Sequence, residues 1–224
     1  MDRKPNLLLW ALLAISTVTL ALGAFALRTE AEATALGSGS TRLPQFIDLL
    51  SSDVTLPLSA QGRRLLLDSC DKAMQTSAPL VLRFASEAQR QMIVPFCTDL
   101  AQAAVETSGA DSYAWLVLAM AQIRQGSVAE AERSIIWSAH TGPTESWIAE
   151  PRFELIQDHY DQFSSTVRAI GDADAVLLLP GNRGAVVAHR YVLDPAFRQR
   201  AQELIEKQPE AVQRRFVLLL RRQT

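Results

Sequence analysis

The chain has 224 residues, of which 48% are hydrophobic and 21% charged, and its formal net charge is −2. Without Asp2, Arg3 and Lys4, it carries 20 basic and 23 acidic side chains, a net charge of −3. This balance excludes the strongly basic face that nucleic-acid binding requires, so we expect no nucleic-acid partner. The length predicts one modest domain plus an additional segment.

The additional segment is an uncharged stretch of 21 residues from Leu7 to Leu27. A helix of this length spans about 30 Å, the thickness of a bilayer's hydrocarbon core. Because Arg3 and Lys4 precede it, the positive-inside rule predicts a cytoplasmic tail at residues 1–6, a single-pass anchor at 7–27 and a periplasmic C-terminal domain, in a bacterial inner membrane. The alternative is a cleaved signal peptide, because Ala24-Phe25-Ala26 matches an A-x-A cleavage site.

Residues 28–56 are expected to link the anchor to the folded domain. The stretch 29–41, TEAEATALGSGST, has the small and polar composition of a flexible linker. Its alanine and glutamate residues also favour a helical continuation of the anchor over the first half. A short helix is expected over residues 43–50, beginning after Pro44.

From Pro57 onward the sequence predicts one helix after another, over residues 59–74, 80–91 and 96–107. No window alternates in the manner of a β-strand, so the predicted fold class is all-α. Pro79 and Pro95 stand at the expected first turns of the second and third helices, where a missing N–H costs no hydrogen bond.

Two cysteines, Cys70 and Cys97, lie in these expected helices. In an oxidising compartment they are candidates for a disulfide, which would contribute about 3–4 kcal/mol for a loop of this length. The alternative is that both are small buried hydrophobic residues. We expect no metal site, because neither has a histidine or a second cysteine at ligand spacing.

Residues 112–143 contain two helical patterns on either side of Gln125-Gly126. The residues that stand at the spacings of a tetratricopeptide repeat are Trp115, Leu118, Ala119, Gly126, Ala131, Ile135 and Pro143. Residues 112–145 therefore resemble one such repeat, although Gln122 and Ser138 depart from the family's pattern. A generic helical hairpin is the alternative.

This resemblance implies a helical hairpin in which Ala119 and Ala131 lie where the two helices cross. It also implies an array of repeats that binds peptides or proteins on its concave face. Because about three repeats are needed to bury a continuous core, the flanking helices are expected to be divergent repeats within a domain at residues 57–170.

The segment 145–170 predicts a second helix pair, interrupted by Pro151, and it is the most aromatic part of the chain. We consider Trp147, Phe153 and Tyr160 as part of a partner surface, with core packing as the alternative. Residues 175–179, AVLLL, fit either a short buried strand or a helix.

Residues 171–224 are expected to form a C-terminal helical cap after a break at Gly171–Asp174. Helices are predicted over 196–207, after an Asp194 cap, and from Pro209 onward. The last helix carries Arg214, Arg215, Arg221 and Arg222. Such a set is typical of a solvated face, and we also include it in the candidate partner surface, for anionic lipid or an acidic polysaccharide.

No catalytic motif and no cofactor site is expected, because His140, His159 and His189 are scattered and no hydrolase or zinc-protease signature occurs. We predict a non-enzymatic scaffold that binds a protein partner in an envelope complex. The closing stretch DPAFRQRAQELIEKQPEAVQRRF resembles helices of small anchored proteins found beside bacterial surface-polysaccharide genes. That resemblance implies a role in exopolysaccharide or O-antigen biosynthesis or export. The alternative function is a periplasmic module that binds an acidic polysaccharide directly.

Overall fold

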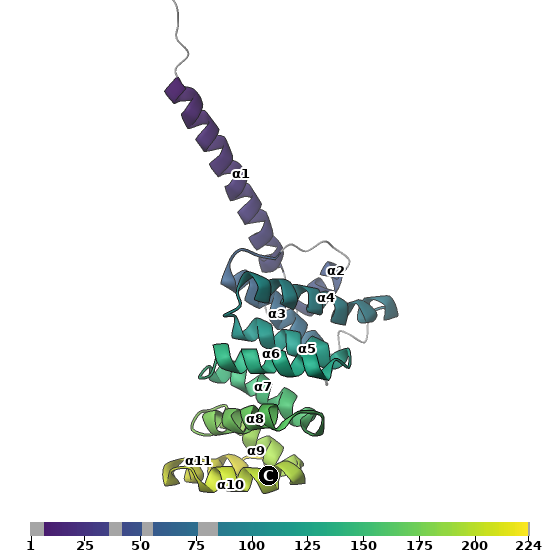
Figure 1. Cartoon of the computed structure of the whole chain (residues 1–224), viewed down its shortest axis with the longest axis vertical. Helices are drawn as coiled ribbons and strands as arrows, with labels where there is room; N and C mark the ends of the chain where they lie inside the picture. The colour runs from purple at the N-terminus through teal and green to yellow at the C-terminus, as the bar shows by residue number, and fades with distance from the viewer. Residues whose placement is uncertain (1–6, 36–41, 51–55, 76–84, 224) are drawn as a thin grey trace, which may run out of the picture. The chain divides into compact units, whose positions relative to one another are not determined.

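The computed structural model describes residues 7–35, 42–50, 56–75 and 85–223 (Figure 1). These residues form eleven α-helices and one short 3-10 helix and contain no strand, so the predicted all-α class is confirmed. The chain divides into two compact units, Met1–Ile93 and Val94–Thr224, and the division falls within α4.

The first helix, α1 (Leu7–Ala35), contains the uncharged stretch and continues eight residues beyond Leu27. Its part from Trp10 to Arg28 is long and apolar enough to cross a membrane, the one such helix among the residues described. The side chains of this part are exposed, with Leu20 at 78%. A membrane anchor and a signal sequence both have these properties.

Two further helices, α2 (Arg42–Leu49) and α3 (Ala60–Met74), complete most of the first unit. α2 buries Phe46 and Ile47, and both α1 and α2 pack on α3. The N-cap of α3 is Ser59, whose hydroxyl accepts a hydrogen bond from the Gly62 N–H at 2.9 Å. Helical structure therefore occupies residues 28–35 and 42–49 of the segment that the sequence predicted as a linker, and residues 36–41 and 51–55 lie outside the described part.

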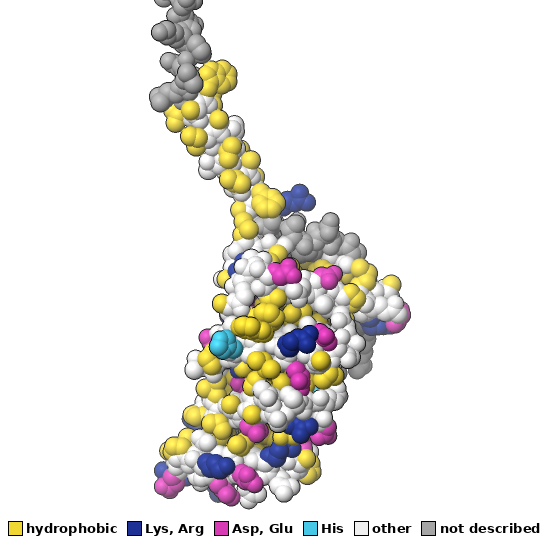
Figure 2. Space-filling model, in the orientation of Figure 1, with side chains coloured by type: hydrophobic (Ala, Val, Ile, Leu, Met, Phe, Trp, Pro, Cys, Tyr) yellow, Lys and Arg dark blue, Asp and Glu magenta, His cyan; other side chains and the backbone are white. Residues whose placement is uncertain are grey.

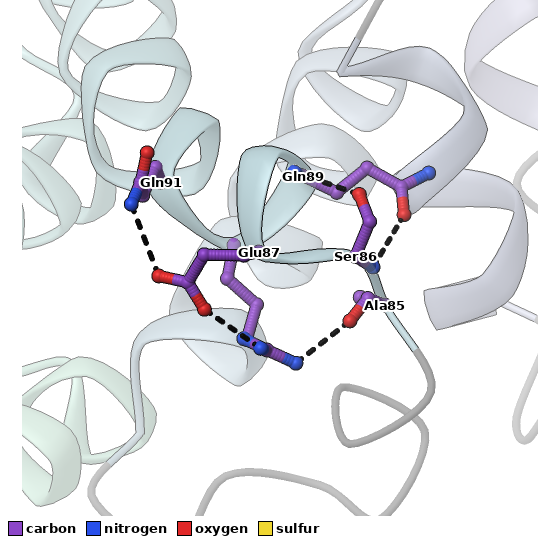
Figure 3. A network of polar contacts seen from close by, with 6 residues as sticks. Ala85, Ser86, Glu87, Gln89 and Gln91 are labelled. Carbon is purple, nitrogen blue, oxygen red and sulfur yellow. Dashed lines mark hydrogen bonds and ion pairs between the residues drawn. The ribbon is translucent and has the colours of Figure 1, made fainter.

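A capping box begins α4 (Glu87–Thr107), as Figure 3 shows. The Ser86 N–H donates to Gln89 Oε1 at 2.8 Å, and the Gln89 N–H donates to Ser86 Oγ at 3.2 Å. Arg90 donates to Glu87 Oε2 at 2.7 Å, and this bond is the largest cause of a lowered pKa at Glu87. Because the box starts the helix, Pro95 lies inside α4, and the prediction that it begins a separate helix is wrong.

Cys70 and Cys97, the two cysteines of the sequence, are both disulfide-bonded. The sequence left open a disulfide or two free buried cysteines, and the structure has the disulfide. Disulfides persist in oxidising compartments and are rare in reducing ones. Together with the apolar helix α1, the bond indicates a protein that is exported to, or anchored in, the cell envelope.

The second unit contains a helical hairpin formed by α5 (Ser112–Arg124) and α6 (Val128–Thr141). Asp111 caps α5 by accepting hydrogen bonds from the N–H groups of Tyr113 and Ala114 at 3.1 and 3.0 Å. Gly126 in the turn has φ of 78°, a left-handed conformation that favours glycine. Ala119 and Ala131 are fully buried within the hairpin.

The next pair, α7 (Ser146–Asp158) and α8 (Ser165–Leu178), is joined through the 3-10 helix η3 (Tyr160–Gln162). Pro151 lies inside α7 and does not interrupt it. Gly171 is buried, and a Cβ added to it would lie 2.8 Å from Ile156 Cγ2. Gly171 therefore permits close packing of α8 on α7, and the expected domain boundary at 170/171 falls inside a helix.

Three helices follow: α9 (Gly184–Leu193), α10 (Pro195–Glu206) and α11 (Glu210–Leu220). Asp194 caps α10 as predicted, whereas α9 was not predicted. A hydrophobic core that includes Phe153, Phe197 and Phe216 joins these helices to α7 and α8. Residues 171–224 thus share a core with the preceding helices.

Candidate interaction surface

Two stacked indole rings lie on the outer side of the α5–α6 hairpin. The ring centroids of Trp115 and Trp137 are 5.9 Å apart, with an interplanar angle of 20°. The His140 ring meets Trp137 edge-on at 5.7 Å, and Trp137 is 49% exposed. Figure 2 shows hydrophobic side chains gathered over α5 and α6. We call the group Trp115, Ile136, Trp137 and His140 the Trp137 surface.

The register of α6 places these side chains outside. Ile135 and Ser138 are fully buried, and consecutive helical residues are about 100° apart around the axis. Ile136 and Trp137 therefore project away from the core, and Ile136 is 40% exposed. The Trp115 indole N–H donates to the Gly109 carbonyl at 2.8 Å, which orients its ring beside Trp137.

Behind this surface lies a buried ion pair between Arg152 of α7 and Asp174 of α8. Arg152 Nε donates to Asp174 Oδ2 at 2.7 Å, and Nη2 donates to Oδ1 at 2.6 Å. The two side chains are only 1% and 4% exposed. Such bidentate, charge-assisted bonds are stronger and more directional than neutral ones.

This ion pair is tied to the hairpin through two serines. Arg152 Nη1 donates to Ser138 Oγ at 3.1 Å, and the Ser112 hydroxyl donates to the Ser138 carbonyl at 2.7 Å. The network thus connects α5, α6, α7 and α8 beneath the indole pair. Ser138, which departs from the repeat pattern, supplies the hydroxyl that a small apolar residue would lack.

The repeat-like residues are divided between the core and the outside of the hairpin. Leu118, Ala119, Ala131 and Ile135 are buried, Gly126 and Pro143 are exposed, and Trp115 is half-buried. The spacing alone did not show that Trp115 would pair with Trp137. The sequence IIW at 135–137 held a usable signal, because three consecutive residues span about 200° around a helix and cannot all face its core.

Of the aromatic residues predicted for a partner surface, Phe153 is fully buried, so its assignment to that surface is wrong. Its ring packs on Phe197, with ring centroids 5.4 Å apart. Trp147 is half-buried, and its ring centroid lies 5.2 Å from that of Tyr113. Phe153 is therefore part of the core, and the Trp147 ring contacts the Tyr113 ring.

Tyr160 is half-buried beneath two guanidinium groups. The Arg200 Cζ lies 3.6 Å from the ring centroid and the Arg168 Cζ 4.8 Å from it, both within cation–π range. Arg200 also donates to Gln157 Oε1 at 3.0 Å. Burial raises the pKa of the nearby Asp172 carboxyl, and the charge of Arg200 opposes that rise. The Tyr160 ring is therefore engaged within the second unit.

The four C-terminal arginines are exposed, on α11 and just beyond its end. Arg214 forms an ion pair with Glu210, and Arg215 donates to Asn182 Oδ1 at 2.8 Å. Val217 and Leu218 between them are 46% and 56% exposed. Arg214 and Arg215 are thus engaged within the chain.

Among the residues that the structure describes, no group of three or more His, Cys, Asp or Glu side chains is placed to hold a metal ion. His140, His159 and His189 lie on different elements, in α6, next to η3 and in α9.

No protein-family model matches the chain, and no curated protein or solved structure matches it either. The fold assigns the chain to a broad structural class. The chain is an all-α protein of packed helical pairs with one apolar N-terminal helix able to cross a membrane.

Proposed function

We propose that this chain is a single-pass inner-membrane scaffold that presents a periplasmic, tetratricopeptide-repeat-like domain to a protein partner. The observation that carries the proposal is the exposed indole pair of the Trp137 surface. Trp137 keeps 49% of its surface in solvent although α5 and α6 are otherwise well packed. Exposed apolar patches mark interaction sites, and tryptophan is enriched among the residues that dominate binding energy.

The architecture of the second unit supports a repeat-like array. The hairpin α5–α6 is followed by the hairpin α7–α8, and the two pack on each other through α5–α7 and α6–α8 contacts. Small residues allow the two helices of each hairpin to approach closely. These residues are Ala119 and Ala131 in the first hairpin and Gly171 in the second. Stacked hairpins of this kind bury a continuous core and leave extended faces for a partner.

The proposed placement rests on α1, on Arg3 and Lys4 before it, and on the disulfide. The positive residues favour a cytoplasmic N-terminus, and a disulfide favours an oxidising periplasm for the remainder. The proposed process is biosynthesis or export of a surface polysaccharide, supported by the resemblance of residues 194–216. The protein is proposed to act by binding and not by catalysis.

A second candidate is a module that binds an acidic polysaccharide through Arg214, Arg215, Arg221 and Arg222. The exposure of these side chains favours it. The engagement of Arg214 by Glu210 and of Arg215 by Asn182 weakens it, because an acidic ligand would have to compete with both. An apolar indole pair fits a protein surface better than a polyanion, so the scaffold is the stronger proposal.

Site-specific photo-crosslinking of the full-length protein in its native cells tests the proposal. A photoreactive residue at position 136 leaves Trp137 intact beside it. We expect one dominant crosslinked protein that is exported or has an exported domain. A photoreactive residue at Gln202, exposed on α10, is the matched control and is expected to give no such product. Equal products at both positions, or none at 136, would overturn the scaffold proposal, and a purely cytoplasmic partner would overturn the orientation.

A further inference from the structure

The carboxylate of Glu30 docks on the N-terminus of α3 within the first unit. The Ser59 N–H donates to Glu30 Oε1 at 2.6 Å, and the Ser59 hydroxyl donates to Glu30 Oε2 at 2.6 Å. Glu30 belongs to α1 and lies two residues beyond Arg28, the last residue of the candidate membrane span. One side chain next to the candidate membrane span therefore contacts the N-terminus of α3.

The N-terminus of α3, which Glu30 contacts, favours a negatively charged carboxylate. Ser59 is the N-cap of α3, and a helix N-terminus carries partial positive charge. Arg63 in the first turn donates to the Leu58 carbonyl at 2.7 Å and adds a full positive charge near Glu30. The hydrogen bonds from Ser59 are the largest cause of a lowered pKa at Glu30, and the charge of Arg63 lowers it further, whereas desolvation opposes both.

Gly62 provides the space for this contact. A Cβ added at position 62 would lie 2.8 Å from Glu30 Oε2 and 2.7 Å from Pro57 Cβ, and both distances are shorter than a Cβ normally keeps from a non-bonded atom. Glycine inside a helix costs about 1 kcal/mol relative to alanine. The glycine in the first turn of α3 is therefore explained by the approach of Glu30 and Pro57, and not by helix formation.

We propose that Glu30, Ser59 and Gly62 form a juxtamembrane clamp that holds α3 at a fixed angle to the membrane helix. The contact joins residues 29 positions apart, so the orientation of α3 does not depend on the length of the intervening chain. In a scaffold this would set how the first folded helices leave the membrane surface. The inference rests on the membrane-anchor part of the proposed function.

Distance measurements by pulsed electron paramagnetic resonance on the full-length protein in lipid nanodiscs test the clamp. Spin-labelled non-canonical residues replace Leu22 of α1 and Gln75 at the end of α3, both exposed, so the native disulfide stays intact. We expect one narrow distance distribution in the otherwise unchanged protein. Glu30→Ala and Gly62→Ala are each expected to broaden it at least twofold, because the first removes the docked carboxylate and the second places a Cβ where that carboxylate docks.

Glu130→Ala is the matched control, because Glu130 is exposed and pairs locally with Arg133. It is expected to leave the distribution narrow, and circular dichroism should show equal helix content in all variants. A narrow distribution in Glu30→Ala and Gly62→Ala, or a broad one without either change, would overturn the clamp. Loss of residues 1–26 by mass spectrometry would overturn the anchor, and the clamp with it, while leaving the crosslinking result at position 136 as a separate test.

Discussion

Replacing Arg152 by methionine is expected to lower the free energy of unfolding by about 3–5 kcal/mol, because it leaves a buried carboxylate without its partner. Asp174 is 4% exposed and receives two hydrogen bonds from Arg152, so water cannot replace the lost guanidinium. The change also removes the bond to Ser138 Oγ beneath the Trp137 surface. Thermal unfolding followed by near-ultraviolet circular dichroism measures the loss.

Two further variants test whether the loss of stability comes from breaking the buried ion pair or from a change in packing. The double change Arg152→Met with Asp174→Leu is expected to regain most of the loss, because apolar residues of similar volume often replace a buried pair without cost. Arg133→Met removes an exposed pair with Glu130 and is expected to cost at most about 1 kcal/mol. A loss below 1 kcal/mol in Arg152→Met would show that the buried network does not hold these helices together.

Replacing Phe153 by alanine is expected to cost about 3–5 kcal/mol, because it removes a fully buried ring and leaves a cavity. The ring packs edge-on against Phe197 in the core shared by α7 to α11. The same unfolding measurement applies. Leu193→Ala is the matched control, since Leu193 is 66% exposed, and it is expected to change stability by less than about 0.5 kcal/mol. Similar losses in both variants would contradict the assignment of Phe153 to the core.

Some helix starts could be predicted from a side-chain cap in the sequence. Asp194 accepts two backbone hydrogen bonds at the start of the predicted helix α10, and Asp111 does the same at the start of α5. These signals are local, so they do not depend on the rest of the fold. Helix propensity and hydrophobic period gave the extents of α3 and α10 to within one residue at each end.

The places of Pro95 and Pro151 inside helices, and the existence of α9, could not be predicted in this way. The sequence predicts a helix start at Pro95, but the capping box at Ser86 and Gln89 begins α4 about two turns earlier. Within the described chain, α9 begins at Gly184 with no side-chain cap from Arg183. A Cβ at Gly184 would lie 3.0 Å from the Leu179 carbonyl oxygen and 3.2 Å from Leu219 Cδ1 of α11, so glycine allows the close approach of both.

In the candidate site too, some features could be predicted from the local sequence and others depend on tertiary contacts. The aromatic composition of 145–170 fitted either core packing or a partner surface. Phe153 is buried in the core, and two arginines contact the Tyr160 ring. The register of α6 was sufficient to place Trp137 outside once Ile135 and Ser138 were assigned to the core. The Arg152–Asp174 pair joins residues 22 positions apart on two helices, and spacing within one helix carries no signal of it.

The most direct test of the proposed role is the affinity of the full-length protein, in nanodiscs, for the partner crosslinked at position 136. If the Trp137 surface dominates binding, Trp137→Ala should weaken the affinity by about 30-fold, which corresponds to roughly 2 kcal/mol. Leu193→Ala, which removes another large exposed side chain, should stay within about twofold of the unchanged protein. Equal affinities in Trp137→Ala and the unchanged protein would contradict the proposal that this surface recruits the partner.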